Sequence, residues 1–190
     1  MFRYYIIAIA VAVALIFGVN AIFVIPHAPL AALAYIALCV LGAFAIDAIV
    51  ALAVRYLVPQ RFYNPLAKRF ACLRLEKKLY TKLGIRKWKD KIPETGGILV
   101  GFGKSHATDL HNNDYVYKFM QETCYAEVMH VWSMPLGFLV LLICPAHLRL
   151  SIALPVAVVN AVLQLLPVMV QRFVRPQLLR VYKGNLKRNG

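Results

Sequence analysis

Glu127 and His130 are the residues whose types and spacing best suit catalysis in this sequence. Three positions apart on a helix, they would share one face, where the carboxylate can hold one nitrogen of the imidazole. A neutral histidine held in this way takes a proton from a hydroxyl group, while the glutamate fixes its tautomer and stabilises the imidazolium. The alternative is an interfacial histidine that only satisfies a neighbouring helix.

A second group of polar residues follows a glycine-rich stretch of the chain. Two histidines and two aspartates are a conceivable metal site, but their spacing fits neither a zinc site nor the HxxxxD motif of glycerolipid acyltransferases. Ordinary loop polarity and helix capping explain the same residues, so we expect no metal and no other bound cofactor. The group comprises Ser105, His106, Asp109, His111 and Asp114.

The whole chain of 190 residues is 61% hydrophobic, yet its formal net charge is +14. A soluble domain of this length cannot enclose so much apolar surface in one core, whereas a membrane can cover it. The length leaves no room for a second large domain, so we predict one all-α membrane domain over residues 1–190. The four cysteines have neither CxxC nor zinc spacing and are expected to be reduced thiols.

Four apolar runs predict helices that cross about 30 Å of hydrocarbon. We place these transmembrane helices at residues 4–25, 30–58, 131–146 and 150–171. The first run is too long for the apolar part of a signal peptide and leads into further membrane sequence. Asp47 lies in the second helix, where a buried anion is costly, so it is expected to be protonated, paired or facing a polar cavity.

The segment between the second and third helices, residues 59–130, is polar and basic. From Leu66 to Leu83 its apolar residues fall on one side, which predicts an amphipathic helix lying in the membrane plane. A surface helix of a soluble subdomain is the alternative for this stretch. Asn112 and its neighbours offer an N-cap for a helix that begins near Tyr115 and leads into the third membrane run.

The distribution of lysine and arginine predicts the orientation of the chain in a bacterial cell membrane. The loop between the first two helices has no such residue and the loop between the last two has only Arg149. By the positive-inside rule, residues 59–130, the basic tail 172–190 and both termini face the cytosol. This topology explains the cations without nucleic acid, which we do not expect as a partner. The cations also suit an anionic co-substrate such as acyl-coenzyme A.

Three stretches of the sequence resemble the glycosyl-4,4′-diaponeurosporenoate acyltransferases, which complete staphyloxanthin-type carotenoid biosynthesis. They are Arg86–Ile92 (RKWKDKI), Glu122–Trp132 (ETCYAEVMHVW) and Pro167–Leu178 (PVMVQRFVRPQL). The stretches occur in the same order as in the family, at compatible spacing. One departure is Val131, which separates His130 from Trp132 where the family has the tryptophan adjacent.

The resemblance implies transfer of a fatty acyl group from acyl-coenzyme A or an acyl carrier to a sugar hydroxyl. The acceptor would be a glycosylated carotenoid, or a similar glycolipid or polyprenoid conjugate, at the cytosolic membrane face. The catalytic residues would be His130 and Glu127. Arg172 would hold a phosphate or the thioester carbonyl of the donor, unless it only neutralises the end of the fourth helix. The expected substrate-binding residues are Asp47, Arg86, Lys87, Trp88, Lys89, Gln171 and Arg172.

Two alternatives remain open at this point. The cations around Trp88 serve equally well as an interfacial anchor that needs no donor. The whole chain, in turn, fits a non-catalytic membrane scaffold for enzymes of an envelope or pigment pathway. A scaffold predicts scattered polar residues without a convergent site.

Overall fold

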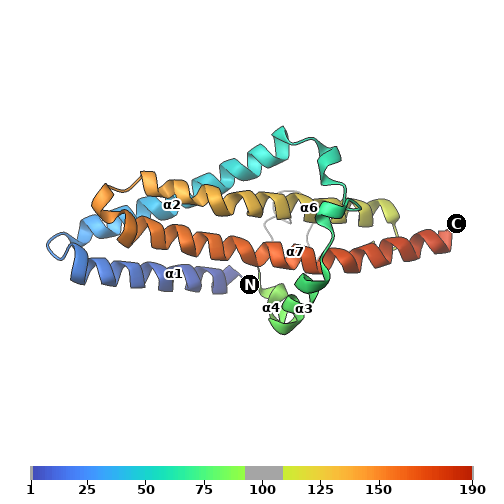
Figure 1. Cartoon of the computed structure of the whole chain (residues 1–190), viewed down its shortest axis with the longest axis horizontal. Coiled ribbons are helices and arrows are strands. Elements are labelled where there is room, and N and C mark those ends of the chain that lie inside the picture. The colour runs from blue at the N-terminus through green and yellow to red at the C-terminus, as the bar shows by residue number, and fades with distance from the viewer. Residues whose placement is uncertain (1, 93–108, 190) are drawn as a thin grey trace. The chain divides into compact units, whose positions relative to one another are not determined.

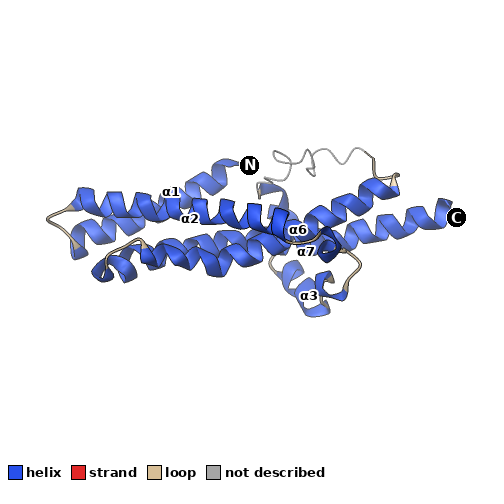
Figure 2. Cartoon of the chain, turned by 90° about the horizontal axis from the view of Figure 1, so that it is seen from above, coloured by secondary structure: helices blue, strands red, loops and turns tan. Residues whose placement is uncertain are grey.

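A computed structural model describes residues 2–92 and 109–189 of the protein (Figure 1). These residues form helices joined by short loops and contain no strand (Figure 2). Four of the helices are long and apolar enough to cross a membrane, which confirms the predicted all-α fold. Ser105 and His106 lie outside the described residues. The four cysteines are free thiols, as predicted.

The chain divides into two compact units, which we describe separately. The apolar unit comprises residues 1–53 and 129–165, and the basic unit comprises residues 54–128 and 166–190. Of the lysines and arginines, only Arg3 and Arg149 belong to the apolar unit. That the chain forms a single domain remains a prediction.

The apolar unit is built from long helices and tight helical turns. Small buried side chains such as Ala32 and Ala153 pack beside larger ones such as Ile36 in its core. Small residues suit this unit because helices in a membrane associate through close packing rather than through a hydrophobic driving force. At Gly42, a Cβ atom would lie 2.5 Å from Cδ1 of Ile143, so a side chain there would require the end of the Ile143 side chain to move. The elements are α1 (Phe2–Val19) with a π turn (Asn20–Val24), α2 (Pro29–Leu57), the end of α6 (Asn113–Leu136), turns at Gly137–Leu142, Ala146–Leu148 and Arg149–Ala153, and the start of α7 (Leu154–Asn189).

In the apolar unit, large apolar side chains are exposed and a polar side chain is buried, as a lipid environment requires. Large side chains such as Leu15 and Leu41 are about two-thirds exposed, at 66% and 65%, and so are available to hydrocarbon. Asn20, by contrast, is fully buried, and its amide donates to the carbonyls of Ile16 (2.8 Å) and Ser151 (2.9 Å). These bonds connect the end of α1 to the turn that precedes α7.

The basic unit contains shorter helices beside parts of α6 and α7. Two buried clusters form its core: Tyr80 and Ile85 pack with residues of α7, and Val116 and Met120 pack with Leu178. Its elements are the end of α2, 3₁₀ turns at Gln60–Tyr63, Lys68–Phe70 and Lys89–Lys91, α3 (Arg74–Lys82), α4 (Ile85–Trp88), α6 up to residue 128, and α7 from residue 166.

The predicted amphipathic helix over residues 66–83 is wrong in its extent. Extended backbone at Ala71 and Leu73 interrupts it, and α3 begins only at Arg74. The reason is local, because the Glu76 carboxylate accepts the Leu73 backbone N–H (2.9 Å) and so caps a new helix. Gly84, with φ of 62°, then adopts the left-handed conformation that separates α3 from α4.

The predicted N-cap of the helix leading into the third membrane run is confirmed. Asn112 Oδ1 accepts the backbone N–H groups of Asp114 (2.9 Å) and Tyr115 (3.3 Å), and α6 begins at Asn113.

Candidate functional site

Polar side chains of the apolar unit gather around one carboxylate, Asp47 of α2. His130 and Ser133 are three positions apart on α6, and Asn160 and Gln164 are four positions apart on α7. These spacings place both members of each pair on the same helix face. The three helices therefore bring five polar groups together in an otherwise apolar environment.

Gln164 connects His130 to Asp47 through two hydrogen bonds. Its side-chain N–H donates to Asp47 Oδ2 (2.5 Å), and its Oε1 lies 2.5 Å from His130 Nδ1. An amide oxygen can only accept, so the hydrogen of this second bond belongs to Nδ1. In the neutral imidazole, Nε2 then carries the lone pair. This arrangement suits a general base that takes a proton through Nε2.

Three buried polar atoms near Asp47 find no hydrogen-bond partner among the described residues. They are Asp47 Oδ1, Ser133 Oγ and Asn160 Nδ2, and both Ser133 and Asn160 interact with the Asp47 carboxyl group. Because these groups contact one another without a hydrogen bond of ordinary geometry, they are only partly satisfied, and a further polar group would complete their hydrogen bonds. Gly137 lets the Asn160 side chain approach the backbone of this segment closely, since a Cβ there would lie 2.6 Å from Asn160 Nδ2.

Tyr5 of α1 supports the same region. Its hydroxyl donates to the backbone carbonyl of Leu163 (2.5 Å), the residue before Gln164. The sequence analysis did not select Tyr5, Ser133, Asn160 or Gln164. The available signal was the pair Asn160 and Gln164, because residues one turn apart share a helix face and amide side chains in a membrane helix form hydrogen bonds to neighbouring helices.

Glu127 belongs to a buried ion-pair network in the basic unit. Its Oε1 lies 2.5 Å from Arg172 Nη1 and its Oε2 lies 2.6 Å from Arg175 Nη1. Arg175 is 2% exposed and also donates to the side chain and carbonyl of Thr123 and to the carbonyl of Phe70. Two guanidinium groups thus bind one carboxylate, and Arg175 makes further hydrogen bonds to uncharged groups of the protein.

This network corrects the expected partnership of Glu127 with His130. The structure pairs Glu127 with two arginines and pairs His130 with Gln164. The physical reason is charge, because a carboxylate gains more from a guanidinium than from a neutral imidazole. Whether Glu127 takes part in catalysis remains a prediction.

Arg172 is occupied by protein groups. In addition to Glu127, it contacts the Glu76 carboxylate at 3.0 Å and donates to the carbonyl of Ala71. Burial opposes the ionisation of Glu76, but the bonds from the Leu73 N–H and from Arg172 outweigh it and lower the pKa of this carboxyl. α7 continues through Gln171 and Arg172, so the alternative that Arg172 neutralises a helix end is wrong.

Trp88 packs within the basic unit, whereas two of the basic residues around it are exposed. Trp88 donates its indole N–H to the carbonyl of Leu83 (3.0 Å) and packs against the core cluster that contains Tyr80. Lys89 pairs with Asp90 (2.6 Å), whereas Arg86 and Lys87 are exposed on α4. The proposed roles of these residues in donor binding or anchoring remain predictions.

The second polar group has only local contacts in its described part. Asp109 Oδ1 accepts the backbone N–H of Asn112 (3.2 Å), a bond within the turn that precedes α6. His111 lines a cavity of the basic unit. Within the described residues, no three His, Cys, Asp or Glu side chains are grouped as a metal site requires.

A comparison with protein-family models finds one family for this chain. The model described as glycosyl-4,4′-diaponeurosporenoate acyltransferase matches residues 59–184, about two thirds of the sequence. The matched residues include His130, Asn160 and Gln164, whereas Asp47 precedes them. No curated protein and no solved structure matches the chain.

Proposed function

The chain belongs to the glycosyl-4,4′-diaponeurosporenoate acyltransferase family, and we propose that His130 is the general base of its acyl transfer. The donor is acyl-coenzyme A or an acyl carrier, and the acceptor is a sugar hydroxyl of a glycosylated carotenoid or a similar glycolipid. The observation that carries this proposal is the hydrogen-bonded chain from Asp47 through Gln164 to His130.

The proposed step begins at His130 Nε2. This nitrogen removes the proton of the acceptor hydroxyl while the oxygen attacks the thioester carbonyl carbon of the donor. The new C–O bond forms, the C–S bond breaks, and the imidazolium returns its proton to the leaving thiolate. Throughout, Nδ1–H stays bonded to Gln164, whose amide is oriented by the Asp47 carboxylate. Through this amide the Asp47 carboxyl group is positioned to stabilise the imidazolium.

Ser133 and Asn160 support binding of the acceptor. Each has a buried polar atom that forms no hydrogen bond of ordinary geometry with the described residues, although both side chains contact Asp47. A sugar supplies several hydroxyl groups that can pair with both. No bound cofactor is needed for this chemistry. The site lies among helices that are long and apolar enough to cross a membrane, and such a location suits an acceptor whose other half is apolar.

We further propose that the basic unit and both termini face the cytosol of a bacterium, where the thioester donor is available. The concentration of cations in this unit supports that orientation. A non-catalytic scaffold, the competing hypothesis, requires no convergent group of polar side chains such as the one around Asp47.

The test uses purified protein in lipid nanodiscs with an acyl-coenzyme A and a glycosylated carotenoid, and the acylated product is counted by mass spectrometry. His130→Ala should lower turnover about 10²–10⁴-fold, the usual contribution of a general base. His147→Ala is the matched control, since His147 is an exposed histidine of the same unit and should keep full activity. Normal turnover by His130→Ala would exclude the proposed proton transfer.

A further inference from the structure

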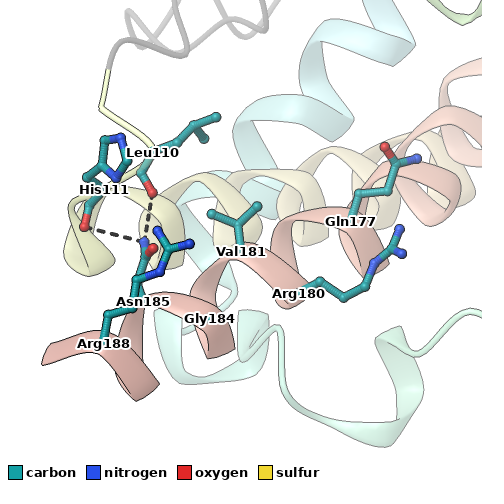
Figure 3. A pocket seen from close by; sticks show the side chains of 8 residues that line it. All are labelled: Leu110, His111, Gln177, Arg180, Val181, Gly184, Asn185 and Arg188. Carbon is teal, nitrogen blue, oxygen red and sulfur yellow. Dashed lines mark hydrogen bonds between the residues drawn. The ribbon is translucent and has the colours of Figure 1, made fainter. Parts of the chain in front are cut away.

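An open cavity of about 640 Å³ lies in the basic unit, between the last turns of α7 and the loop that precedes α6 (Figure 3). This volume is within the 300–1,000 Å³ typical of small-molecule sites. Residues of α7 that recur every three or four positions form one wall, so a single helix face is presented to the cavity. The lining residues are Leu110, His111, Gln177, Arg180, Val181, Gly184, Asn185 and Arg188.

Asn185 fixes the loop at one side of the cavity, and Gly184 leaves room within it. The Asn185 side chain, 7% exposed, donates to the carbonyls of Leu110 (2.7 Å) and His111 (3.3 Å), as the dashed lines in Figure 3 show. These bonds hold the loop against α7. A Cβ atom at Gly184 would meet no atom within 4 Å, so the glycine borders open space.

The charge of the cavity is positive and unbalanced. Arg180 and Arg188 are exposed and form no ion pair with the described residues, and none of the described lining residues is acidic. This distinguishes them from Arg172 and Arg175, whose guanidinium groups are bound to carboxylates. Eight residues of α-helix separate the two arginines by about 12 Å along the axis. One phosphate does not span that distance, whereas a molecule with several phosphate groups does.

We propose that this cavity binds the phosphate groups of the acyl donor, and that the donor is a coenzyme A thioester. Arginine suits this ligand because its planar guanidinium makes paired hydrogen bonds to phosphate oxygens. Two arginines, Gln177 and His111 supply donors for both the diphosphate and the separate phosphate of the nucleotide. The proposal rests on the acyltransferase function and names its donor. It places the donor phosphates mainly on Arg180 and Arg188, which lie outside the three stretches that resemble the family.

The test measures equilibrium binding of coenzyme A to the purified full chain in detergent, by calorimetry. The double variant Arg180→Gln/Arg188→Gln should raise the Kd at least tenfold, as expected for the loss of charge-assisted hydrogen bonds. Lys183→Gln removes an exposed cation of the same helix that does not line the cavity, and should change the Kd less than twofold. Pantetheine, which lacks phosphate, should not bind measurably.

A second pair of variants tests the cavity without changing charge. Gly184→Phe should fill the open space and weaken coenzyme A binding, whereas Gly184→Ala should leave it intact. Unchanged binding by the double arginine variant and by Gly184→Phe would overturn the proposal. So would a double variant that loses binding to phosphatidylglycerol vesicles but keeps coenzyme A, since lipid head groups would then be the ligand.

Failure of this proposal is distinguishable from failure of the proposed function. His130→Ala should bind coenzyme A normally, because that residue belongs to the apolar unit and the binding assay involves no chemistry. If the wild-type protein turns over acyl-coenzyme A while the arginine variants bind and react normally, only the donor site is wrong. If the protein binds coenzyme A through the arginines but acylates nothing, only the acyltransferase mechanism is wrong.

Discussion

Replacing Gln164 with leucine is the sharpest test of the proposed base. The change keeps the approximate volume of the side chain but removes both the acceptor for His130 Nδ1–H and the donor to Asp47. The imidazole then loses the contact that fixes its tautomer, and the carboxylate loses its connection to the ring. Gln164→Leu should therefore reduce kcat rather than the affinity for the acceptor.

The size of the effect follows from the bonds that are lost. A hydrogen bond that involves a charged group contributes about 1.5–3 kcal/mol. If that contribution is made mainly to the imidazolium of the transition state, kcat falls about 10- to 150-fold. The KM for the acceptor should change little, because Gln164 has no unpaired group to offer a substrate. Folding should survive, since leucine is compatible with a membrane helix.

The assay is acyl transfer in nanodiscs at saturating donor and acceptor, with kcat and KM determined separately over a range of pH. Gln121→Leu is the matched control, because Gln121 is a glutamine of α6 whose side chain makes a 3.3 Å bond to the Gln60 carbonyl in the basic unit. A purely structural role for Gln164 would lower the amount of folded protein without changing kcat per folded molecule. A folded Gln164→Leu protein with wild-type kcat and pH profile would refute the proposed connection of Asp47 to His130 through Gln164.

Three further results are expected. Arg175→Met should destabilise the protein by about 3–5 kcal/mol, seen as a lower Tm, because it leaves part of the buried Glu127 charge without its partner; an unchanged Tm would show that the pair is dispensable. The pKa of Glu76 is lower in the folded protein than the value near 4.5 expected for the unfolded chain. The ionised carboxylate therefore stabilises the fold above pH 4.5, and this stabilisation is lost as the pH falls through the folded pKa. Glu76→Gln should flatten the pH dependence of Tm in that acid range. Single cysteines at Lys78 and His27, in a background without native cysteines, should show opposite accessibility to an impermeant thiol reagent in intact cells; equal labelling from outside would contradict the cytosolic placement of the basic unit.

Much of the fold was predictable from the sequence because membrane helices follow from simple requirements. Long apolar runs must satisfy their backbone hydrogen bonds internally, which makes them helical regardless of detailed packing. The start of α6 at Asn113 was predictable from Asn112 as an N-cap. The break before α3 was not, since it depends on a hydrogen bond from Leu73 to Glu76 that competes with continuing the helix.

The site was only partly predictable, because the spacing of residues within one helix does not specify their partners on other helices. The selection of His130 and Asp47 followed from the cost of placing ionisable groups in a membrane. Their connection through Gln164 depends on which sides of α2, α6 and α7 are turned toward one another. The residue pattern of a single helix does not determine this. The resemblance to the acyltransferase family, which the family comparison confirms, indicated the reaction but not these contacts.

The different partners of Glu127 and His130 follow from one electrostatic rule. A buried carboxylate needs cations or several donors, and Glu127 has Arg172 and Arg175. A histidine that must alternate between neutral and charged forms cannot be held by such a strong ion-pair network, because a bound cation would oppose its protonation. A neutral amide such as Gln164 accepts from Nδ1–H in both forms and passes on the influence of Asp47. The arginine-bound glutamate is therefore suited to stabilising the fold, and the amide-bound histidine to accepting a proton.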